Sequence, residues 1–465
     1  MQLKGNARIE LTDVSTGEVE IVEEDNMITN AVSDLFSRNI EAMLFNIGDD
    51  GGTNWSDYHL PICPNAIGGI LLFSEALEED TDNIYPPSDN TCIGYASNDV
   101  NATTNVMRGS MNLTESGKIE NGYRFVWDFT TSQANGTISA VALTHKMGGI
   151  GFFGDDYSSV NKWVRMKRLA TVVNVEEANY YVDAVEVNFD ENYMYSISIN
   201  MVNEIIITKL RKCFRQVGLN FSLLSEDEVL ETQTITPTVF INTDLNKSYG
   251  YFDFIDGEDG YWYGFNGTAN SSGNASVKWI KIDKSDYSFT EGKWTLEGAL
   301  ICNCGQRSGY GTSPTRSVYC VIRNGYVYFM HYNKTGVYKI KLDNCADITF
   351  IPFGFTSKFS GGGDQGTTYM WKWGDRIMGS DFIINVDDSI VHTANSNSLS
   401  YACSPLFQYG PYGLIFGRYY LLKMYIYKGL WVMTPYLASI NNLDTAVIKT
   451  ADRTMKITYT VTETE

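Results

Sequence analysis

The feature that most constrains this chain is a pair of strands that recurs along its middle. In the clearest copy, Asp259-Gly260 precedes an aromatic strand over Tyr261–Phe265, and a second strand follows at Val277–Ile282. Three further segments keep this order of parts, namely Tyr193–Tyr195 with Ile205–Leu210, Tyr326–Met330 with Val337–Leu342, and Arg376–Met378 with Ser389–His392. Repeated β-meanders of about 40–50 residues are typical of propeller blades, which must stack because one blade cannot bury both of its faces. We therefore predict a mainly β protein with a β-propeller of about five to six blades.

The composition agrees with a β-rich chain and argues against two classes of partner. Among 465 residues there are 30 Tyr and 41 Gly, which favour strands and turns over helices. The formal net charge of −20 argues against nucleic acid and against an anionic membrane surface, because both require clustered Lys and Arg. No apolar run approaches the roughly 18 residues of a membrane span, and no secretory signal pattern is present. We expect no nucleic-acid partner and no membrane insertion.

The eight cysteines are expected to be buried thiols, because nothing points to a secretory route. The Cys302-x-Cys304 spacing is too tight for the usual zinc knuckle. We therefore predict no metal site and no cofactor.

Both ends of the chain have a different pattern from its middle. Residues 1–24 alternate around Ser15-Thr16-Gly17 as a hairpin, and a helix is expected from Thr29 or Asn30, with apolar positions Val32, Leu35, Phe36, Ile40, Met43 and Leu44. Strands are expected at 68–75, 108–112, 123–129 and 138–144, and a basic connector at 161–168. The last strand, 454–461, alternates like the first hairpin, so we expect the two ends to share one sheet. This predicts a mixed, β-sandwich-like domain with one helix from residues 1–164 and 425–465, with the propeller inserted as residues 165–424.

Short motifs in these two end segments carry a resemblance to a known family. They are Leu3–Val14, Thr16–Glu20, Asn26–Ala31, Gly69–Phe73, Arg108–Ser110, Trp127–Phe129, Thr131–Ile138, Ala142–His145, Ser439–Leu443, Lys449–Asp452 and Met455–Thr460. Together they resemble tail, collar or fibre-like structural proteins in the virions of phages of Gram-positive gut bacteria. The resemblance covers roughly residues 1–155 and 433–465, and it leaves the middle as the part where members differ.

The resemblance implies a virion component that is made in the host cytoplasm and present in several copies or as a homo-oligomer. Its terminal domain would bind other virion proteins of the tail, collar or head, and its propeller would adhere to a host cell-surface glycan. Two alternatives remain open: a glycan depolymerase on the virion, either a glycoside hydrolase or a lyase, and a head-decorating protein with no receptor role.

No catalytic motif stands out, and we do not expect an enzyme. The four histidines are far apart in the sequence, and the chain has no Gly-x-Ser-x-Gly, His-Glu-x-x-His or P-loop pattern. A group of acids, Asp253, Asp256, Glu258 and Asp259, precedes the strand at Tyr261. Paired carboxylates can serve glycoside hydrolysis or bind calcium, but turn chemistry alone explains Asp and Gly at this place.

Aromatic side chains are the candidates for binding carbohydrate, since flat rings beside Asp and Asn suit sugar rings. The candidate residues are Trp262, Trp279, Tyr310, Tyr369, Trp371 and Trp373. The alternative is that these rings pack blade against blade, because alternating aromatic residues lie on one strand face. Three loops are long enough to provide an exposed contact surface, at 266–276, 303–316 and 358–369.

Overall fold

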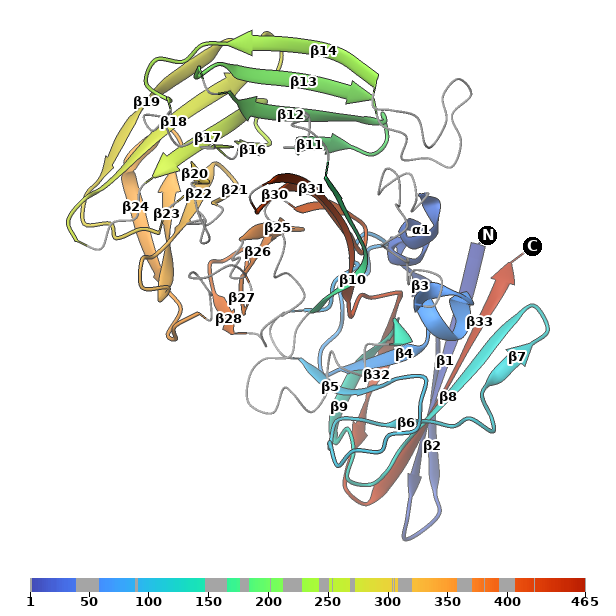
Figure 1. Ribbon diagram of the computed structural model, residues 1–465. Coiled ribbons are helices and arrows are strands. Elements are labelled where there is room, and N and C mark those ends of the chain that lie inside the picture. Colours follow the sequence, from blue (N-terminus) through green and yellow to red (C-terminus); the bar gives the residue numbers. More distant parts are fainter. Residues whose placement is uncertain are drawn as a thin grey trace.

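The computed structural model describes the 465-residue chain except for residues 1, 39–57, 88–90, 147–164, 176–183, 201, 212–227, 242–250, 253, 268–271, 303, 305, 308–319, 358–369, 380, 393–405, 422 and 465. The described part is built almost entirely of antiparallel sheets, so the prediction of a mainly β protein is confirmed. In Figure 1 these sheets fall into two regions, one made by both ends of the chain and one made by its middle.

The middle region contains five four-stranded antiparallel sheets, which we call the five-sheet region. The first is β11 (Ala184–Asn188), β12 (Tyr193–Ile199), β13 (Ile205–Arg211) and β14 (Glu228–Ile235), and the second is β16 (Phe254–Asp256), β17 (Tyr261–Gly267), β18 (Ala275–Asp283) and β19 (Phe289–Leu296). The third is β21 (Val321–Arg323), β22 (Tyr326–Met330), β23 (Gly336–Lys341) and β24 (Asn344–Pro352), and the fourth is β25 (Trp371–Trp373), β26 (Arg376–Met378), β27 (Phe382–Ile384) and β28 (Ile390–His392). A separate two-stranded sheet pairs β15 (Tyr251–Phe252) with β20 (Gln306–Arg307).

The fifth sheet joins segments that are far apart in the sequence. Its order is β10 (Arg165–Val175), β31 (Lys423–Thr434), β30 (Tyr412–Leu421) and β29 (Leu406–Tyr409). Two expectations differ from this arrangement. The predicted connector at 161–168 is strand from Arg165 onward, and the predicted boundary at 424/425 falls inside β31, which pairs with β10 and β30 along its length. Basic residues and the absence of alternation marked 161–168 as a connector, but backbone pairing with a distant strand decides its structure.

The recurring strand pairs of the sequence are the second and third strands of the first three sheets. The tight turn Asn324-Gly325, with φ of 52° and 77°, joins β21 to β22, and such turns favour Asn-Gly because both residues take positive φ. In the fourth sheet the prediction was wrong: Ser389–His392 falls on the fourth strand, and β27 was missed. The three residues of β27 are all buried, so they show no alternation that a sequence pattern can reveal.

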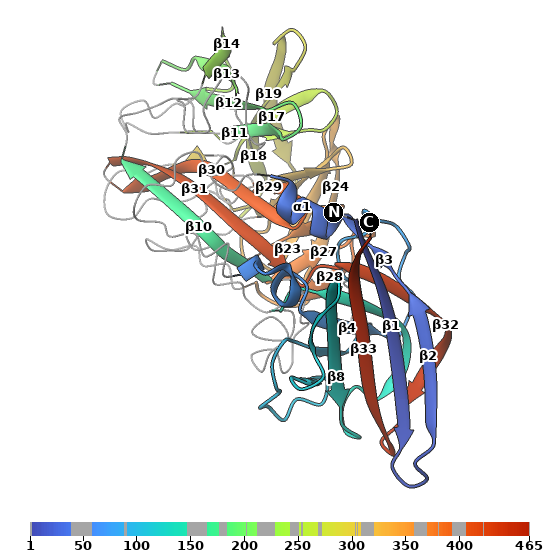
Figure 2. The ribbon, with the colours of Figure 1, turned by 90° about the vertical axis from the view of Figure 1, so that its right-hand side faces the viewer.

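The two ends of the chain form a sandwich of two sheets, which we call the terminal sandwich. One sheet has the order β2 (Val19–Asp25), β1 (Gln2–Asp13), β33 (Arg453–Thr464), β8 (Gly122–Phe129) and β6 (Ser110–Met111), and β7 (Gly117–Ile119) also pairs with β8. The other is β3 (Met27–Ile28), β32 (Ser439–Lys449), β9 (Gly136–Thr144), β4 (Gly69–Phe73) and β5 (Cys92–Ala96). β1 pairs with β33 from Gln2↔Thr464 to Asp13↔Arg453, so the prediction that the first and last strands share one sheet is confirmed (Figure 2).

The predicted helix is α1, which spans Asn30–Ser37. Thr29 is its N-cap, since its hydroxyl oxygen accepts a hydrogen bond from the Ala31 amide at 3.3 Å. The predicted apolar positions 40, 43 and 44 lie outside the described residues. A short π-helical turn, η1 (Ile62–Ala66), precedes β4. No helix in the described part of the chain is long and apolar enough to cross a membrane.

The sheet that contains β4 is buried on both faces, and this joins the two regions. Ile70 and Leu72 face the core of the sandwich, where Trp127 and Ile457 of the opposite sheet also lie. On the other face, Leu71, Phe73, Ala140 and Ala142 share a second core with Trp371, Trp373 and Trp431 of the fourth and fifth sheets. The five-sheet region therefore packs directly on the terminal sandwich through an apolar contact.

Candidate functional site

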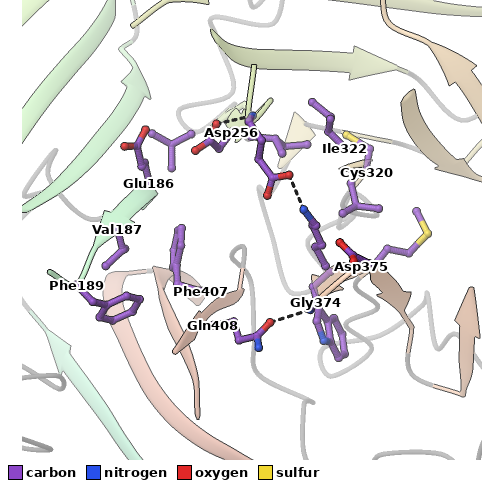
Figure 3. A pocket seen from close by; sticks show the side chains of 17 residues that line it. Glu186, Val187, Phe189, Asp256, Cys320, Ile322, Gly374, Asp375, Phe407 and Gln408 are labelled. Carbon is purple, nitrogen blue, oxygen red and sulfur yellow. Dashed lines mark hydrogen bonds and ion pairs between the residues drawn. The ribbon is translucent and has the colours of Figure 1, made fainter. Parts of the chain in front are cut away.

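A cavity at the centre of the five-sheet region is the candidate functional site (Figure 3). Its volume is about 470 Å³, a size that suits a small organic ligand. The innermost strand of every sheet contributes to its wall, with Val185, Glu186 and Val187 from β11, Ile255 and Asp256 from β16, Val321 and Ile322 from β21, Trp371 and Lys372 from β25, and Phe407 and Gln408 from β29. Phe189, Glu258, Cys320, Met370, Gly374 and Asp375 complete the wall.

Two carboxylates from neighbouring sheets share one lysine at this cavity. Nζ of Lys284 lies 2.7 Å from Oε2 of Glu186 and 2.7 Å from Oδ1 of Asp256. Trp262 Nε1 also donates to Oε2 of Glu186, at 3.1 Å. Burial acts to lower the pKa of Lys284, but its hydrogen bonds to Asp256 and Glu186 outweigh burial and raise it above the usual value. The first and second sheets are thus held together by a charged, hydrogen-bonded link at their inner strands.

A second ion pair spans the cavity between the second and fourth sheets. Glu258, in the turn that follows β16, pairs with the Lys372 ammonium on β25 (Figure 3). On the fourth and fifth sheets, the Gly374 amide donates to Gln408 Oε1 at 2.8 Å. Asp375 lines the cavity and is exposed, and no described side chain pairs with its carboxylate.

The structure separates the four acids that the sequence grouped. Asp253 lies outside the described residues. Asp256 and Glu258 line the cavity, whereas Asp259 acts as a turn residue: it accepts hydrogen bonds from the Tyr261 amide at 3.2 Å and from the Tyr263 hydroxyl at 2.7 Å. The carboxylate that shares Lys284 with Asp256 is that of Glu186, which the sequence analysis missed. In the sequence, Glu186 stands out only as a charged residue within an apolar strand, and Lys284 is marked only by its place directly after Asp283.

Burial governs what the predicted carbohydrate-binding aromatic residues can contact. Trp262 is 0% exposed and Trp373 is 1% exposed, so neither indole presents a face to solvent. Trp371 lines the cavity and also packs in the core shared with the terminal sandwich. Trp279 is partly buried against Trp294, while 310 and 369 lie outside the described residues. Carbohydrate binding by these aromatic residues stays a prediction; among the described ones Trp279 is partly exposed, and Trp371 is 6% exposed at the cavity wall.

The three loops considered for exposed contact surface begin at one end of the five-sheet region. Gly267 and Cys304 pair through their backbones, with N–O distances of 3.0 and 2.9 Å, so the first two loops start side by side. The Cys302 amide donates to Met330 O, and the Ser357 amide donates to Lys334 O, which brings the start of the third loop to the same end. β17 runs from the turn containing Glu258 to Gly267, so this end is opposite to that turn. The loops themselves lie largely outside the described residues.

The histidines and cysteines show no constellation that marks an enzyme among the described residues. His59 and His145, distant in sequence, meet with ring centroids 5.3 Å apart, and both are fully buried. Their place is the junction of the two regions, since His59 also contacts Tyr412 of β30. Six of the eight cysteines are described, and all six are thiols. No group of three or more His, Cys, Asp or Glu in the described part is arranged to hold a metal ion.

Comparison with known proteins identifies no family for this chain. No family model matches the sequence, and no curated protein matches it. Among solved structures, apo AztD from Citrobacter koseri is 8% identical with a TM-score of 0.25, over 60% of this chain and 60% of that chain. A second AztD structure from Citrobacter koseri is 9% identical with a TM-score of 0.24, over 63% of this chain and 61% of that chain. The chain thus covers less than two thirds of these neighbours, and such low similarity supports no statement about function.

Proposed function

We propose that this chain is a structural protein of a phage virion, an appendage of the tail or collar that adheres to the host surface. The observation that carries the proposal is the pairing of β1 with β33, which builds the terminal sandwich from both ends of the chain. These two ends are also where the sequence resembles virion proteins. A constant attachment domain with an inserted display domain has this organisation, because insertion is tolerated where chain ends lie together.

The display domain of the proposal is a five-bladed β-propeller. In support, the innermost strands of successive sheets contact one another, and all five line one cavity. The ring centroids of Phe189, next to β11, and Tyr409 of β29 are 5.1 Å apart, which brings the first sheet against the fifth. The fifth sheet combines β10 with β29–β31, so the start and the end of this region are joined by backbone hydrogen bonds. The domains of the proposal are then 1–164 with 435–465, and 165–434.

The direction of display follows from where the loops begin. The terminal sandwich contacts the turn after β25 and the turn between β29 and β30, since Tyr85 packs on Trp373 at 5.1 Å and donates to Gly410 O. The three long loops begin at the opposite ends of the strands, as the backbone contact of Gly267 with Cys304 indicates. A particle that binds the sandwich would therefore leave these loops free to meet a host glycan. Many weak contacts on one particle gain strength through effective concentration.

Three measurements test the proposal. Mass spectrometry of purified particles should detect the chain, and labelling by a specific antibody in electron microscopy should place it at the tail or collar. The purified full chain should then compete with particles for adsorption to host cells. Absence from the particles overturns the virion assignment, labelling over the whole head supports a decorating role, and failure to compete removes the adhesion role.

A second candidate function, glycan depolymerisation, has one observation in its favour. Glu186 and Asp256 contact the same ammonium, so two carboxyl groups lie close together beside a cavity, as glycosidases require. Against it, both carboxylates are engaged by Lys284. Reducing-sugar release from host cell-wall or capsular polysaccharide decides between the two functions. Release that is lost in both Glu186→Gln and Asp256→Asn would establish the enzyme.

A further inference from the structure

The central cavity has an excess of negative charge that its own lysines do not balance. Among the residues that the structure describes, four carboxylates line it, those of Glu186, Asp256, Glu258 and Asp375, and Lys372 is the single lining lysine. Lys284 adds one positive charge behind Glu186 and Asp256. Among the described residues, four negative charges therefore face two positive ones, and the surplus attracts a cation. The partly buried Glu186 and Asp256 are screened less by salt than the exposed Glu258 and Asp375.

The carboxylates keep acceptor capacity toward the cavity. The contacts with Lys284 use Oε2 of Glu186 and Oδ1 of Asp256, which leaves the second oxygen of each group without a donor among the described residues. No described side chain donates to the carboxylate of Asp375; Arg323 donates to its backbone carbonyl oxygen only. An ammonium group brings three N–H donors and one positive charge, and thus satisfies acceptors from more than one of these carboxylates.

Apart from Lys372 and Gln408, most of the remaining wall is apolar, which favours a ligand with a carbon skeleton over a bare ion. Val185, Val187, Ile255 and Ile322 line the same cavity as the carboxylates. The rings of Phe189 and Phe407 also belong to this wall (Figure 3). A carbon skeleton can fill a cavity of about 470 Å³, and an aromatic ring also attracts an organic cation. We propose that this cavity binds a small organic ammonium of the size of an amino sugar. The site itself does not depend on a virion location; only the identification of the amine with a host-surface amino sugar rests on the proposed function.

The Glu258–Lys372 pair allows a test in which one substitution should strengthen cation binding and another should weaken it. Lys372 competes with a ligand ammonium for Glu258, so Lys372→Met frees that carboxylate and makes the cavity more negative. Binding of a cation should then become several-fold tighter. Asp375→Asn removes one unbalanced charge and should weaken binding by roughly three- to tenfold, the usual range for one charge-assisted contact at a partly exposed site.

The experiment is calorimetric titration of the purified full chain at low salt and about pH 6.5, below the usual pKa of such an amine. The probes are glucosamine and glucose, which differ only in the amino group. We expect glucosamine to bind in the millimolar range and glucose to produce no saturable heat. Asp343→Asn is the matched control, because Asp343 is an exposed acid outside the cavity, so its removal changes the net charge by the same amount and breaks an exposed pair with Lys341.

Equal binding of both sugars, no binding of glucosamine, or identical effects of Asp375→Asn and Asp343→Asn would each overturn the proposal. A chain that binds glucosamine but is absent from particles would keep this site and refute the proposed function. A chain that blocks adsorption but does not bind glucosamine would support the proposed function and refute this site.

Discussion

The terminal sandwich and the five-sheet region are both all-β and both pack through apolar cores, but they differ in the length of their strands and in the charged side chains that link neighbouring sheets. In the sandwich, twelve-residue strands pair along their whole length, and apolar side chains of two facing sheets form one core. In the five-sheet region the inner strands β16, β21 and β25 have three residues each, and charged side chains join the sheets there. The difference teaches that where the pairing strands are short, side-chain links between sheets add to what backbone pairing and apolar packing provide.

Arg323 is the strongest case of such a side chain. It is 2% exposed, and its guanidinium donates to three carbonyl oxygens of the fourth sheet, at Asp375, Ile384 and Asn385. It also donates to the Tyr328 hydroxyl and to Asp388 Oδ1, the latter at 2.6 Å. One planar group with five donors thereby links the third and fourth sheets.

The largest expected effect is therefore that of Arg323→Met. Removing the guanidinium leaves three carbonyl oxygens without this donor and leaves Asp388 with Lys339 and the Tyr328 hydroxyl, so the free energy of unfolding should fall by about 4 kcal/mol. Denaturant titration measures the loss, and hydrogen exchange should show it in β21–β28 while β1 and β33 keep their protection. Arg453→Met, which breaks an exposed pair with Glu20, is the control and should cost under about 1 kcal/mol. Equal losses in the two variants would contradict the comparison.

The second prediction concerns the terminal sandwich, where the substitution removes a buried apolar side chain. Ile457 is fully buried in β33 and lies directly opposite Ile9 of β1. Ile457→Ala should lower the free energy of unfolding by about 3 kcal/mol through lost burial and the resulting cavity. Here exchange should accelerate in β1, β8 and β33 first. If β21–β28 loosen to the same extent, the two regions unfold as one unit, and the comparison fails as a statement about separate stability.

A third effect concerns the junction and depends on pH. Burial, with Lys146 nearby, lowers the pKa of His59 to about 3, and burial also lowers the pKa of His145. The unfolded chain takes up protons near pH 6.5 while the folded chain does not, so stability is lost as the pH falls below about 6.5. His59 alone should account for about 2 kcal/mol at pH 5. Denaturant titrations at pH 7.5 and pH 5 should show a smaller difference in His59→Leu than in the parent chain.

The smallest expected effect concerns Asp34 at the same junction, where stability is lost as the pH rises rather than as it falls. Burial, together with Asp82, raises the pKa of Asp34 to about 6, and this carboxyl lies against Gly410 of the fifth sheet. Its folded pKa is above the unfolded one, so the stability it contributes at low pH is lost as the pH rises through about 4 to 6. Asp34→Asn should stabilise the chain at pH 7 by about 1 kcal/mol, a figure reduced for its partial exposure. No gain at pH 7, or an equal gain at pH 4, would argue against this origin.

Much of the architecture followed from local pattern in the sequence. Alternation in 1–24 and 454–461 predicted the shared terminal sheet, Thr29 predicted the start of α1, and aromatic strands after turn residues predicted the second and third strands of three sheets. These predictions were right because each depends on a few neighbouring residues, either an alternation of apolar and polar residues or a single residue that caps a helix or forms a turn. The count of about five to six blades came instead from the length of the middle region at roughly 40–50 residues a blade, and it stays a prediction.

Only the tertiary structure decided the rest. The inner strands are too short to show a period, and the fifth sheet pairs β10 with β31 from opposite ends of the middle region, so no local window contains it. The cavity has the same origin: Glu186 and Lys284 become partners of Asp256 because separate sheets meet at one centre. Residue type and spacing set what each strand can pair with locally, whereas contacts between distant strands depend on how whole sheets pack, and this is where the charges that define the candidate site come together.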